Sequence, residues 1–251
     1  HDALAIGRMK RPKLGWSRFR GWRVLPGQIR NVTVRCDAGQ WFAAIQYECD
    51  IPEPVKRVFP AAGIDRGVVA TIAVSGAGRT KGLDAYRKAL KKLRRNQRIV
   101  ARRRKGSQNR RKAVLRVARL HRKVRRVRAD FLHKVSYQLA KNHGTLVFED
   151  LKIRNMVRSA SGTITEPGRH VRQKAGLNRA ILDQGWGILR SFCGYKAAER
   201  GGQCLDVPAR NTSRECRLCG YIAAENRLSQ SRFLCVSCGH AENADDNASV
   251  V

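Results

Sequence analysis

Two Cys-x-x-Cys pairs near the end of the chain constrain its fold more than any other feature of the sequence. The pairs are Cys216 with Cys219 and Cys235 with Cys238, which gives the spacing Cys-x2-Cys-x15-Cys-x2-Cys. Four thiolates at this spacing can hold one tetrahedral zinc ion, and a glycine after each pair lets the backbone turn toward the sulfur atoms. Because the protein supplies all four ligands, the site is closed. The pattern therefore predicts a zinc ribbon with a structural Zn²⁺.

The other four cysteines stand singly, at Cys36, Cys49, Cys193 and Cys204. A secreted disulfide scaffold is short and dense in cysteine, and this chain of 251 residues is neither. Reduced thiols in the cytosol fit this usage better, so we expect a cytoplasmic, nucleoid-associated protein. We also expect the single cysteines to pack as small apolar residues.

Three acidic residues, far apart in the sequence, have the character of ligands for divalent ions. Asp65 and Glu149 each end an apolar run, and a third acid follows the last cysteine pair within the segment Asp245-Asp246-Asn247. An Asp at the end of a strand is often only a turn residue, so one acid alone decides nothing. Hydrolysis of a phosphodiester with two divalent ions needs several converging carboxylates, and the ends of neighbouring strands can provide them. The set therefore predicts a catalytic Mg²⁺ or Mn²⁺ site.

The charge of the chain predicts its class of partner. It carries 52 Lys and Arg residues against 19 Asp and Glu residues, a formal net charge of +33. A polyanion is the expected partner of so basic a chain, and nucleic acid is the usual one. A basic surface of ribosomal type, or one that is simply solvated, is the alternative. We expect no membrane contact, because no segment approaches the roughly 18 consecutive apolar residues of a membrane span.

The sequence of residues 84–143 predicts a long basic helical region. Apolar residues recur in its second half at three- and four-residue steps, which places them on one face of a helix. They are Val117, Leu120, Val124, Val127, Phe131, Val135 and Leu139. Residues 106–109 interrupt the pattern and predict a turn between two helices. Asp84 and Asp130 are the only acids in the region, so ion pairs within the helices cannot neutralise it. We therefore predict a helix pair that faces phosphate groups rather than a merely solvated face.

The rest of the chain alternates between strands and helices. Residues 28–36 and 41–49 alternate apolar and polar side chains around a turn, which predicts a hairpin. Aromatic residues among arginines precede it, at Trp16, Phe19 and Trp22, where they either stack nucleic-acid bases or pack a small β-barrel. Further strands are predicted at 63–65, 68–75, 145–149 and 203–207, a turn at 76–82, a basic loop at 152–174, a helix at 180–200 and a short helix from Asp245 onward. This order implies an α/β core with the acids at strand ends.

Four motifs then occur in a fixed order along the chain. They are residues 63–67 (GIDRG), 148–151 (FEDL), 212–220 (TSRECRLCG) and 244–248 (ADDNA). With them, the chain resembles the TnpB/OrfB proteins of bacterial insertion sequences, which are relatives of type V CRISPR effectors. Residues 11–20 resemble the end of that family's wedge β-barrel. The resemblance covers nearly the whole chain.

The resemblance implies an α/β fold with an RNase H-like (RuvC-type) core, a long basic helical segment, an inserted zinc ribbon and an N-terminal β-barrel fragment. The implied parts are a barrel fragment at 1–60, a nuclease core with the basic helix pair at 61–210, the ribbon at 211–240 and the last catalytic motif at 241–251. It also implies RNA-guided cleavage of DNA, with a guide RNA and a DNA target as partners. The cofactors would be a structural Zn²⁺ and catalytic Mg²⁺ or Mn²⁺.

The same resemblance implies the catalytic acids Asp65, Glu149 and Asp245. The family's last motif reads Asp-x-Asn-Ala-Ala, which aligns Asp245 rather than Asp246, and Ser249 replaces the second alanine. Because the chain starts with neither an initiator Met nor a signal peptide, and lacks the family's recognition lobe, we expect an N-terminally truncated member. Two functions stay open: a metal-dependent DNA endonuclease encoded by a transposon, or a nucleic-acid-binding zinc-ribbon remnant that does not cleave.

Overall fold

The structure is a computed structural model that describes residues 6–11, 15–20, 27–55, 59–208, 211–229, 231–248 and 250, and for the first two segments it describes the backbone alone. The side chains of Trp16, Phe19 and Trp22, predicted to stack bases or to pack a barrel, lie outside this description. Two compact units make up the chain. One comprises residues 1–53 with 96–122, and the other comprises 54–95 with 123–251.

Two antiparallel hairpins provide the strands of the first unit. They pair β1 (Ile6–Arg11) with β2 (Gly15–Arg20), and β3 (Gln28–Asp37) with β4 (Gln40–Glu48). The second pair confirms the hairpin predicted from alternation. Its turn consists of Ala38 and Gly39, whose φ angles of 50° and 81° belong to the two-residue turns that match the twist of paired strands. The described residues form two separate sheets here, so they do not show the predicted barrel fragment.

The β3–β4 turn packs on the first half of helix α2 (Gln108–Asn142). A Cβ atom at Gly39 would lie 3.3 Å from a methyl carbon of Leu115, so a larger residue would crowd this contact. The Arg122 guanidinium donates a hydrogen bond of 2.6 Å to the backbone oxygen of Asp37. These contacts explain why residues distant in the sequence form one unit.

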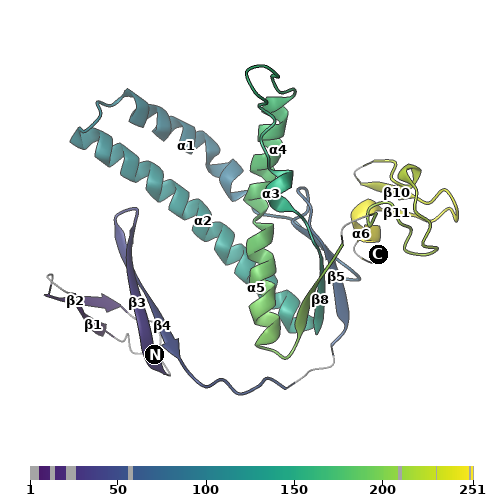
Figure 1. Ribbon diagram of the computed structural model, residues 1–251, viewed down its shortest axis with the longest axis horizontal. Helices are drawn as coiled ribbons and strands as arrows, with labels where there is room; N and C mark the ends of the chain where they lie inside the picture. Colours follow the sequence, from purple (N-terminus) through teal and green to yellow (C-terminus); the bar gives the residue numbers. More distant parts are fainter. Residues whose placement is uncertain are drawn as a thin grey trace. The chain divides into compact units, whose positions relative to one another are not determined.

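A mixed five-stranded sheet forms the centre of the second unit (Figure 1). The strands are β5 (Ala61–Asp65), β6 (Ile72–Val74), β7 (Gly78–Thr80), β8 (Thr145–Glu149) and β9 (Gln203–Val207). Their order is β7-β6-β5-β8-β9; β5, β8 and β9 run parallel, and β6 is antiparallel to β5 and β7. The predicted α/β class and three predicted strands, those at 63–65, 145–149 and 203–207, are confirmed.

The segment after β5 departs from its prediction. The apolar run at 68–75 predicts one long strand, but only β6 forms within it. The predicted turn at 76–82 contains strand β7. Gly76 and Gly78 have φ angles of 71° and 81°, so the chain reverses within a few residues and pairs back on β6.

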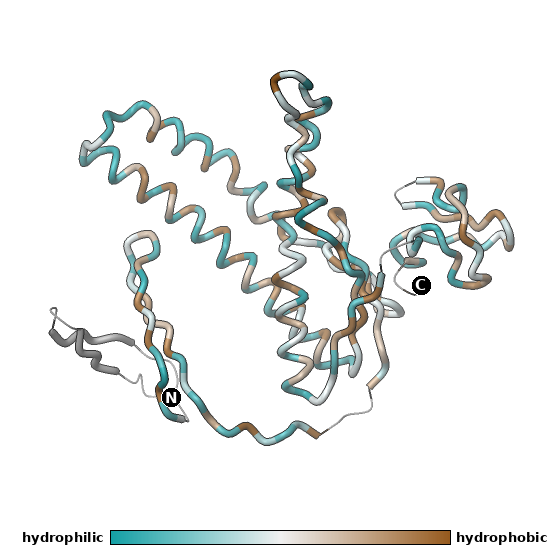
Figure 2. Tube along the Cα trace, in the orientation of Figure 1, coloured by the Kyte–Doolittle hydropathy of each residue, from teal (hydrophilic) through white to brown (hydrophobic). Residues whose placement is uncertain are grey.

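Buried apolar side chains from the sheet and from two helices form the core of the second unit. They include Ile64, Leu146 and Phe148 from the strands, Leu132 and Leu139 from α2, and Leu189 and Cys193 from α5 (Trp186–Ala198). Figure 2 shows the apolar residues concentrated along β5 and β8. Burial of each large apolar side chain contributes about 1.5–3 kcal/mol. The core thus fixes the ends of β5 and β8.

The helix pair confirms the predicted helical region and its break. Helix α1 (Ala85–Arg102) and α2 flank a turn at 103–107. The buried face of α2 confirms most of its predicted stripe, because Val124 and Leu139 are buried and Phe131 and Val135 pack against the core. Val127 is 37% exposed, and Leu132, which lies outside the predicted stripe, is fully buried. Leu132 lies two four-residue steps after Val124, so it widens the face of α2 that is covered by the core.

The region after β8 contains more helix than predicted. Helix α3 (Ile153–Met156) and the first turn of α4 (Val171–Gln184) lie inside the predicted loop at 152–174. The single helix predicted at 180–200 is divided between α4 and α5. Gly185 separates them with a φ of 70°, and a Cβ atom there would lie 2.9 Å from a methyl carbon of Leu132. Glycine is therefore required both by the left-handed backbone and by the close approach to α2.

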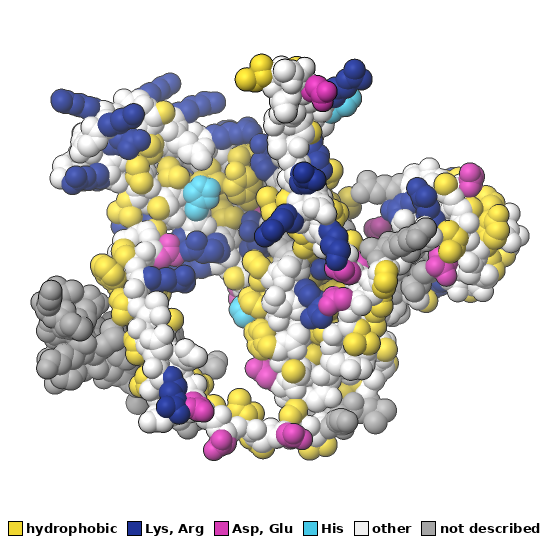
Figure 3. All heavy atoms as spheres, viewed as in Figure 1, with side chains coloured by type: hydrophobic (Ala, Val, Ile, Leu, Met, Phe, Trp, Pro, Cys, Tyr) yellow, Lys and Arg dark blue, Asp and Glu magenta, His cyan; other side chains and the backbone are white. Residues whose placement is uncertain are grey.

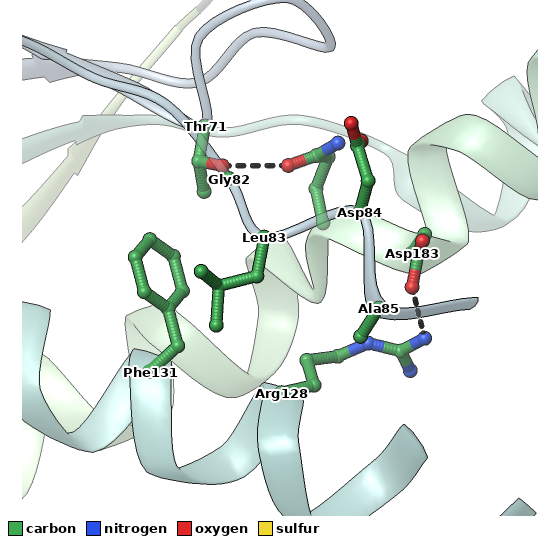
Figure 4. Close-up of a pocket in the computed structure, with 9 residues that line it drawn as sticks. Thr71, Gly82, Leu83, Asp84, Ala85, Arg128, Phe131 and Asp183 are labelled. Carbon is green, nitrogen blue, oxygen red and sulfur yellow. Dashed lines mark hydrogen bonds and ion pairs between the residues drawn. The ribbon is translucent and has the colours of Figure 1, made fainter. Parts of the chain in front are cut away.

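Asp183 anchors the start of α1 (Figure 4). Its carboxylate accepts the backbone N–H of Tyr86 at 2.9 Å and pairs with the Arg128 guanidinium of α2 at 2.5 Å. The Asp183 side chain is only 5% exposed. A carboxylate at a helix N-terminus accepts hydrogen bonds from N–H groups that have no partner within the helix, and its negative charge interacts favourably with the helix dipole. Nearby, the Thr71 hydroxyl donates to the side-chain oxygen of Gln184 at 2.6 Å. These contacts join α1, α2 and α4 next to the sheet.

Candidate metal centres

The four paired cysteines converge into one cluster. Their sulfur atoms all lie within 4.8 Å of one another, with 3.7 Å between those of Cys216 and Cys238 and 3.5 Å between those of Cys219 and Cys235. None of them is in a disulfide. A tetrahedral Zn²⁺ with bonds of about 2.3 Å places its sulfur ligands about 3.8 Å apart. The cluster therefore fits zinc in both donor type and spacing.

The backbone around the cluster favours metal binding by these cysteines. Gly220 and Gly239 adopt φ angles of 69° and 74°, and their N–H groups donate to the carbonyls of Cys216 and Cys235 at 2.8 and 3.0 Å. The N–H of Cys238 approaches the sulfur of Cys235 at 3.5 Å and lowers the pKa of that thiol to about 6, whereas desolvation and the neighbouring sulfur atoms raise the pKa of the Cys219 thiol to about 12. A lowered thiol pKa favours the thiolate that binds metal.

A small core and two buried asparagines hold the ribbon together. Strands β10 (Arg232–Leu234) and β11 (Ala241–Asn243) pair antiparallel next to the short 3-10 helix η1 (Ala224–Asn226), and Phe233 is fully buried against the cysteines. Asn226 and Asn247 are also fully buried. The sequence does not indicate that either asparagine is buried. Asn247 belongs to the motif at 244–248, and Asn226 belongs to no motif.

Asp65 and Glu149 end neighbouring parallel strands. Ile64 of β5 lies opposite Phe148 of β8, so the next residues, Asp65 and Glu149, leave the same edge of the sheet. Asp245 comes to this edge from α6 (Ala244–Ala248), which directly follows β11. Burial raises the pKa of Asp65 to about 6, and repulsion from Glu149 and Asp245 adds to the shift. The structure thus brings Glu149 and Asp245 within electrostatic reach of Asp65.

The acids are near one another without forming a tight cluster. In the described part of the chain, only the four cysteines have three or more ligand atoms all within 4.8 Å. Carboxylates bind Mg²⁺ and Mn²⁺ as hard oxygen donors, and two catalytic ions are about 4 Å apart, so their ligands need not touch. Closely placed negative charges of this kind fit a divalent cation.

Hydroxyl and guanidinium groups contact these acids. The Thr212 hydroxyl donates to a carboxylate oxygen of Glu149, and the Arg66 guanidinium donates to the Glu149 backbone oxygen. Asp245 lies 3.9 Å from the Arg227 guanidinium of the ribbon. Asp246 instead lies 3.3 Å from Arg79 of β7. Neither Thr212 nor Arg227 stands out in the sequence as part of an acidic site.

Asp65→Asn is expected to stabilise the protein in the absence of added Mg²⁺ or Mn²⁺. The folded state binds the Asp65 proton more tightly than the unfolded state, because the pKa rises from 3.8 to about 6. The stability from this group is complete below pH 4 and is lost as the pH rises through about 6. Asparagine removes the cost of a buried charge, so the free energy of unfolding at pH 7.5 should rise by about 2–3 kcal/mol, with little change at pH 4.

Urea unfolding of zinc-loaded protein at the two pH values measures this effect. Asp246→Asn is the matched control, because that carboxylate is 39% exposed and lies beside Arg79. We expect the control not to gain stability at pH 7.5. Equal unfolding free energies for Asp65→Asn and the wild type at pH 7.5 would contradict the raised pKa.

Basic side chains gather over the α1–α2 helix pair (Figure 3). Asp84 and Asp130, the two acids of residues 84–143, form local ion pairs. Asp84 pairs with Arg87 at 2.6 Å and Asp130 pairs with Lys134 at 2.7 Å. Most of the positive charge of the pair thus has no carboxylate on the same helices to offset it. Such a surface favours phosphate groups.

Nucleic-acid binding by the chain is expected to weaken steeply with salt. Contact with 6–10 phosphates would reduce the affinity by about 10³–10⁵ between 50 and 200 mM salt. Changing Arg111 and Lys112, exposed residues of α2, to Gln should reduce the slope by about 1 for each phosphate that is no longer neutralised. Fluorescence anisotropy with labelled DNA measures the slope. Arg30→Gln is the control, because Glu48 already pairs with Arg30; a salt-independent affinity would exclude the helix pair as the binding surface.

Comparison with known proteins gives the family. Residues 44–160 match the family OrfB_IS605, described as "Probable transposase", and residues 186–251 match the family described as "Cas12f1-like, TNB domain". The chain is 45% identical over 236 residues to the protein named "Putative RNA-guided DNA endonuclease InsQ" from Escherichia coli (strain K12), which covers 94% of this chain and 59% of that protein. The chain belongs to the TnpB/OrfB family.

Further similarities agree with the TnpB/OrfB assignment. A protein of Streptomyces pristinaespiralis named "Putative RNA-guided DNA endonuclease" is 33% identical over 220 residues, 87% of this chain and 50% of that protein. The chain thus spans between 50% and 59% of the length of these two relatives.

A solved structure supports the fold of the TnpB/OrfB chain. It is named "Cryo-EM structure of the Cas12f1-sgRNA-target DNA complex", and the likeness has a TM-score of 0.51 at 19% identity over 87% of this chain and 54% of the other. The mixed sheet described above therefore belongs to a fold also found in Cas12f1. In the parts of the chain that the structure describes, no helix has the length and apolar character needed to cross a membrane.

Proposed function

We propose that this chain carries the catalytic site of a transposon-encoded, RNA-guided DNA endonuclease of the RuvC-like type. The observation that carries the proposal is the gathering of Asp65, Glu149 and Asp245 at one edge of the sheet, next to a four-cysteine ribbon. Both relatives have names that begin "Putative RNA-guided DNA endonuclease", which supports DNA as the substrate and RNA as the guide.

The three carboxylates would hold two Mg²⁺ or Mn²⁺ ions. Such ions, when bound, activate the attacking water and stabilise the leaving oxygen of a phosphodiester. Asp65 must lose its proton to act as a ligand, and its pKa of about 6 leaves it mostly ionised at neutral pH. Arg227 of the ribbon lies beside Asp245, and its positive charge offsets a small part of the rise that burial, Glu149 and Asp245 cause in the pKa of Asp65.

The arrangement favours Asp245 over Asp246 as the third acid. The charge of Asp245 raises the pKa of Asp65, which requires the two carboxylates to be close. Asp246 lies on the same short helix but beside Arg79 of β7. We therefore expect Asp246→Ala to retain more activity than Asp245→Ala.

The basic surface of α1 and α2 would hold the nucleic-acid backbone while the acids cleave it. This division of labour separates affinity from catalysis, because phosphate contacts supply binding without reading sequence. The alternative, a nucleic-acid-binding remnant that does not cleave, accounts for the charge but not for three acids at one edge of the sheet. The retained acid site therefore favours the endonuclease.

Incubation of labelled single-stranded DNA with the purified chain tests the proposal. We expect cleavage products with Mg²⁺ or Mn²⁺ and none when Ca²⁺ replaces them, because Ca²⁺ prefers longer, more flexible coordination. DNA binding should persist in all three conditions. Binding without cleavage in Mg²⁺ and in Mn²⁺ would overturn the proposal and favour the non-cleaving alternative.

A further inference from the structure

Thr212 lies outside both predicted metal centres, yet it connects them. It stands just before the first cysteine of the ribbon, and its hydroxyl donates to a carboxylate oxygen of Glu149 at the end of β8. Thr212 is 9% exposed, so little water competes for this hydrogen bond. We propose that Thr212 is a positioning residue that fixes the Glu149 carboxylate for ion binding and makes the divalent-ion site depend on the folded ribbon. This inference rests on the function proposed above.

A tight turn aims the Thr212 side chain at Glu149. Asn211 has a φ of 69°, and its carbonyl accepts the N–H groups of Arg214 and Glu215 at 2.7 and 3.0 Å. Asparagine is one of the few residues that adopt this left-handed conformation at low cost. The turn leads directly into Cys216, so the position of Thr212 is tied to the first cysteine pair.

The two buried asparagines of the ribbon hold the same turn. The Asn226 side chain donates to the Arg214 carbonyl at 2.8 Å and to the Tyr221 carbonyl at 2.9 Å, and it accepts the Val236 N–H at 2.9 Å. It therefore links the turn to both cysteine pairs. If the ribbon unfolded, the three hydrogen bonds of Asn226 would be lost together.

Asn247 links the same turn to the helix that carries the third acid, Asp245. Its side chain donates to the Glu215 carbonyl at 2.7 Å and accepts the Arg217 N–H at 3.1 Å. Asn247 is on α6, the helix that carries Asp245. The turn that holds Glu149 and the helix that bears Asp245 are thus joined by hydrogen bonds through the start of the ribbon.

The chemistry of Thr212 suits a positioning role. A β-branched side chain has a restricted χ1 angle, so the hydroxyl is already directed before an ion arrives. A glutamate side chain without a partner samples several rotamers, and their loss opposes ion binding. Removing the hydrogen-bond partner of a metal-binding side chain typically lowers affinity or activity by about 10–100-fold.

Mn²⁺ binding to the full zinc-loaded chain, followed by electron paramagnetic resonance, tests the inference. Thr212→Val removes the hydroxyl and keeps the shape of the side chain. We expect it to weaken Mn²⁺ binding by about 10–100-fold, and we expect Thr212→Ser, which restores the hydroxyl, to recover most of the affinity. Ser213→Ala, which removes the neighbouring hydroxyl, is the matched control and should bind Mn²⁺ as the wild type does.

Asp65→Ala in the same assay separates the two proposals. If Asp65→Ala binds Mn²⁺ as tightly as the wild type, the proposed catalytic site is wrong. If Asp65→Ala weakens binding but Thr212→Val does not, only the role of Thr212 is overturned.

Zinc content and a double-mutant cycle distinguish positioning from folding. Thr212→Val should retain one zinc per chain. In thermal unfolding, its effect should shrink when Glu149 is already Ala, because the two side chains act as a pair. Loss of zinc from Thr212→Val, or an effect on unfolding that is the same with and without Glu149, would overturn the positioning role.

Discussion

Cys219→Ala is expected to remove the bound zinc and to unfold the ribbon while the five-stranded sheet stays folded. The ribbon core consists of Phe233, two cysteines and Ala244, which is too small to fold without its metal. Binding of structural Zn²⁺ contributes about 10–16 kcal/mol in comparable peptides, and three remaining thiolates form a poorer site. Elemental analysis should give one zinc per wild-type chain and well below one for the variant.

Hydrogen exchange of the same proteins shows where folding is lost. Backbone N–H groups around Cys216 and Cys235 should lose protection in Cys219→Ala, whereas those of β5 and β8 should keep it. Cys36→Ala is the matched control, because Cys36 is exposed and outside the cluster. A wild-type chain with little zinc, or a variant that keeps its full protection, would contradict the zinc ribbon.

The sequence predicts well the features that depend on local periodicity. Strands β8 and β9 have the bounds predicted from the sequence, and the acid at the end of β8 follows from the apolar residues before it. Paired cysteines predict their cluster because ligand spacing within a knuckle is fixed by a few residues. Both kinds of feature are determined by neighbours along the chain.

Features that depend on contacts between distant segments are missed. Gly185 breaks a predicted helix because Leu132 of α2 packs against it, and the sequence around Gly185 does not contain that information. The buried face of α2 extends to Leu132 for the same reason, since the elements packed on the helix decide how wide a face is covered.

Polar residues with a role in the site are missed in a similar way. Thr212 opens the motif at 212–220 and Asn226 belongs to no motif, but nothing in the sequence links either residue to the acids, because their hydrogen-bond partners are distant in sequence or in loops. The prediction that single cysteines pack as apolar residues holds for Cys193, which is fully buried, but is wrong for Cys36, which is exposed. Cys36 is near the end of a two-stranded hairpin, where neither face is fully covered.

Asp65→Ala is expected to abolish DNA cleavage and to leave DNA binding nearly unchanged. Asp65 is at the centre of the proposed site, because both Glu149 and Asp245 act on its carboxylate. Loss of this ligand would remove several kcal/mol of transition-state stabilisation, which corresponds to a rate at least about a thousandfold lower. The basic surface of α1 and α2 is untouched, so the salt-dependent affinity for DNA should remain.

Single-turnover cleavage and anisotropy, measured on the same preparations, separate the two effects. Glu149→Gln should lose cleavage to a similar degree, because a neutral amide is a weaker ligand for Mg²⁺ than a carboxylate. Asp150→Asn is the matched control: it changes the neighbouring acid, which is half-exposed and paired with Lys152, and it should cleave like the wild type. Equal cleavage by Asp65→Ala and the wild type would show that the acids at the sheet edge do not carry the reaction. If Asp65→Ala lost binding and cleavage to the same degree, the acids would instead be part of the DNA-binding surface. Their negative charge argues against this outcome, because it repels phosphate groups.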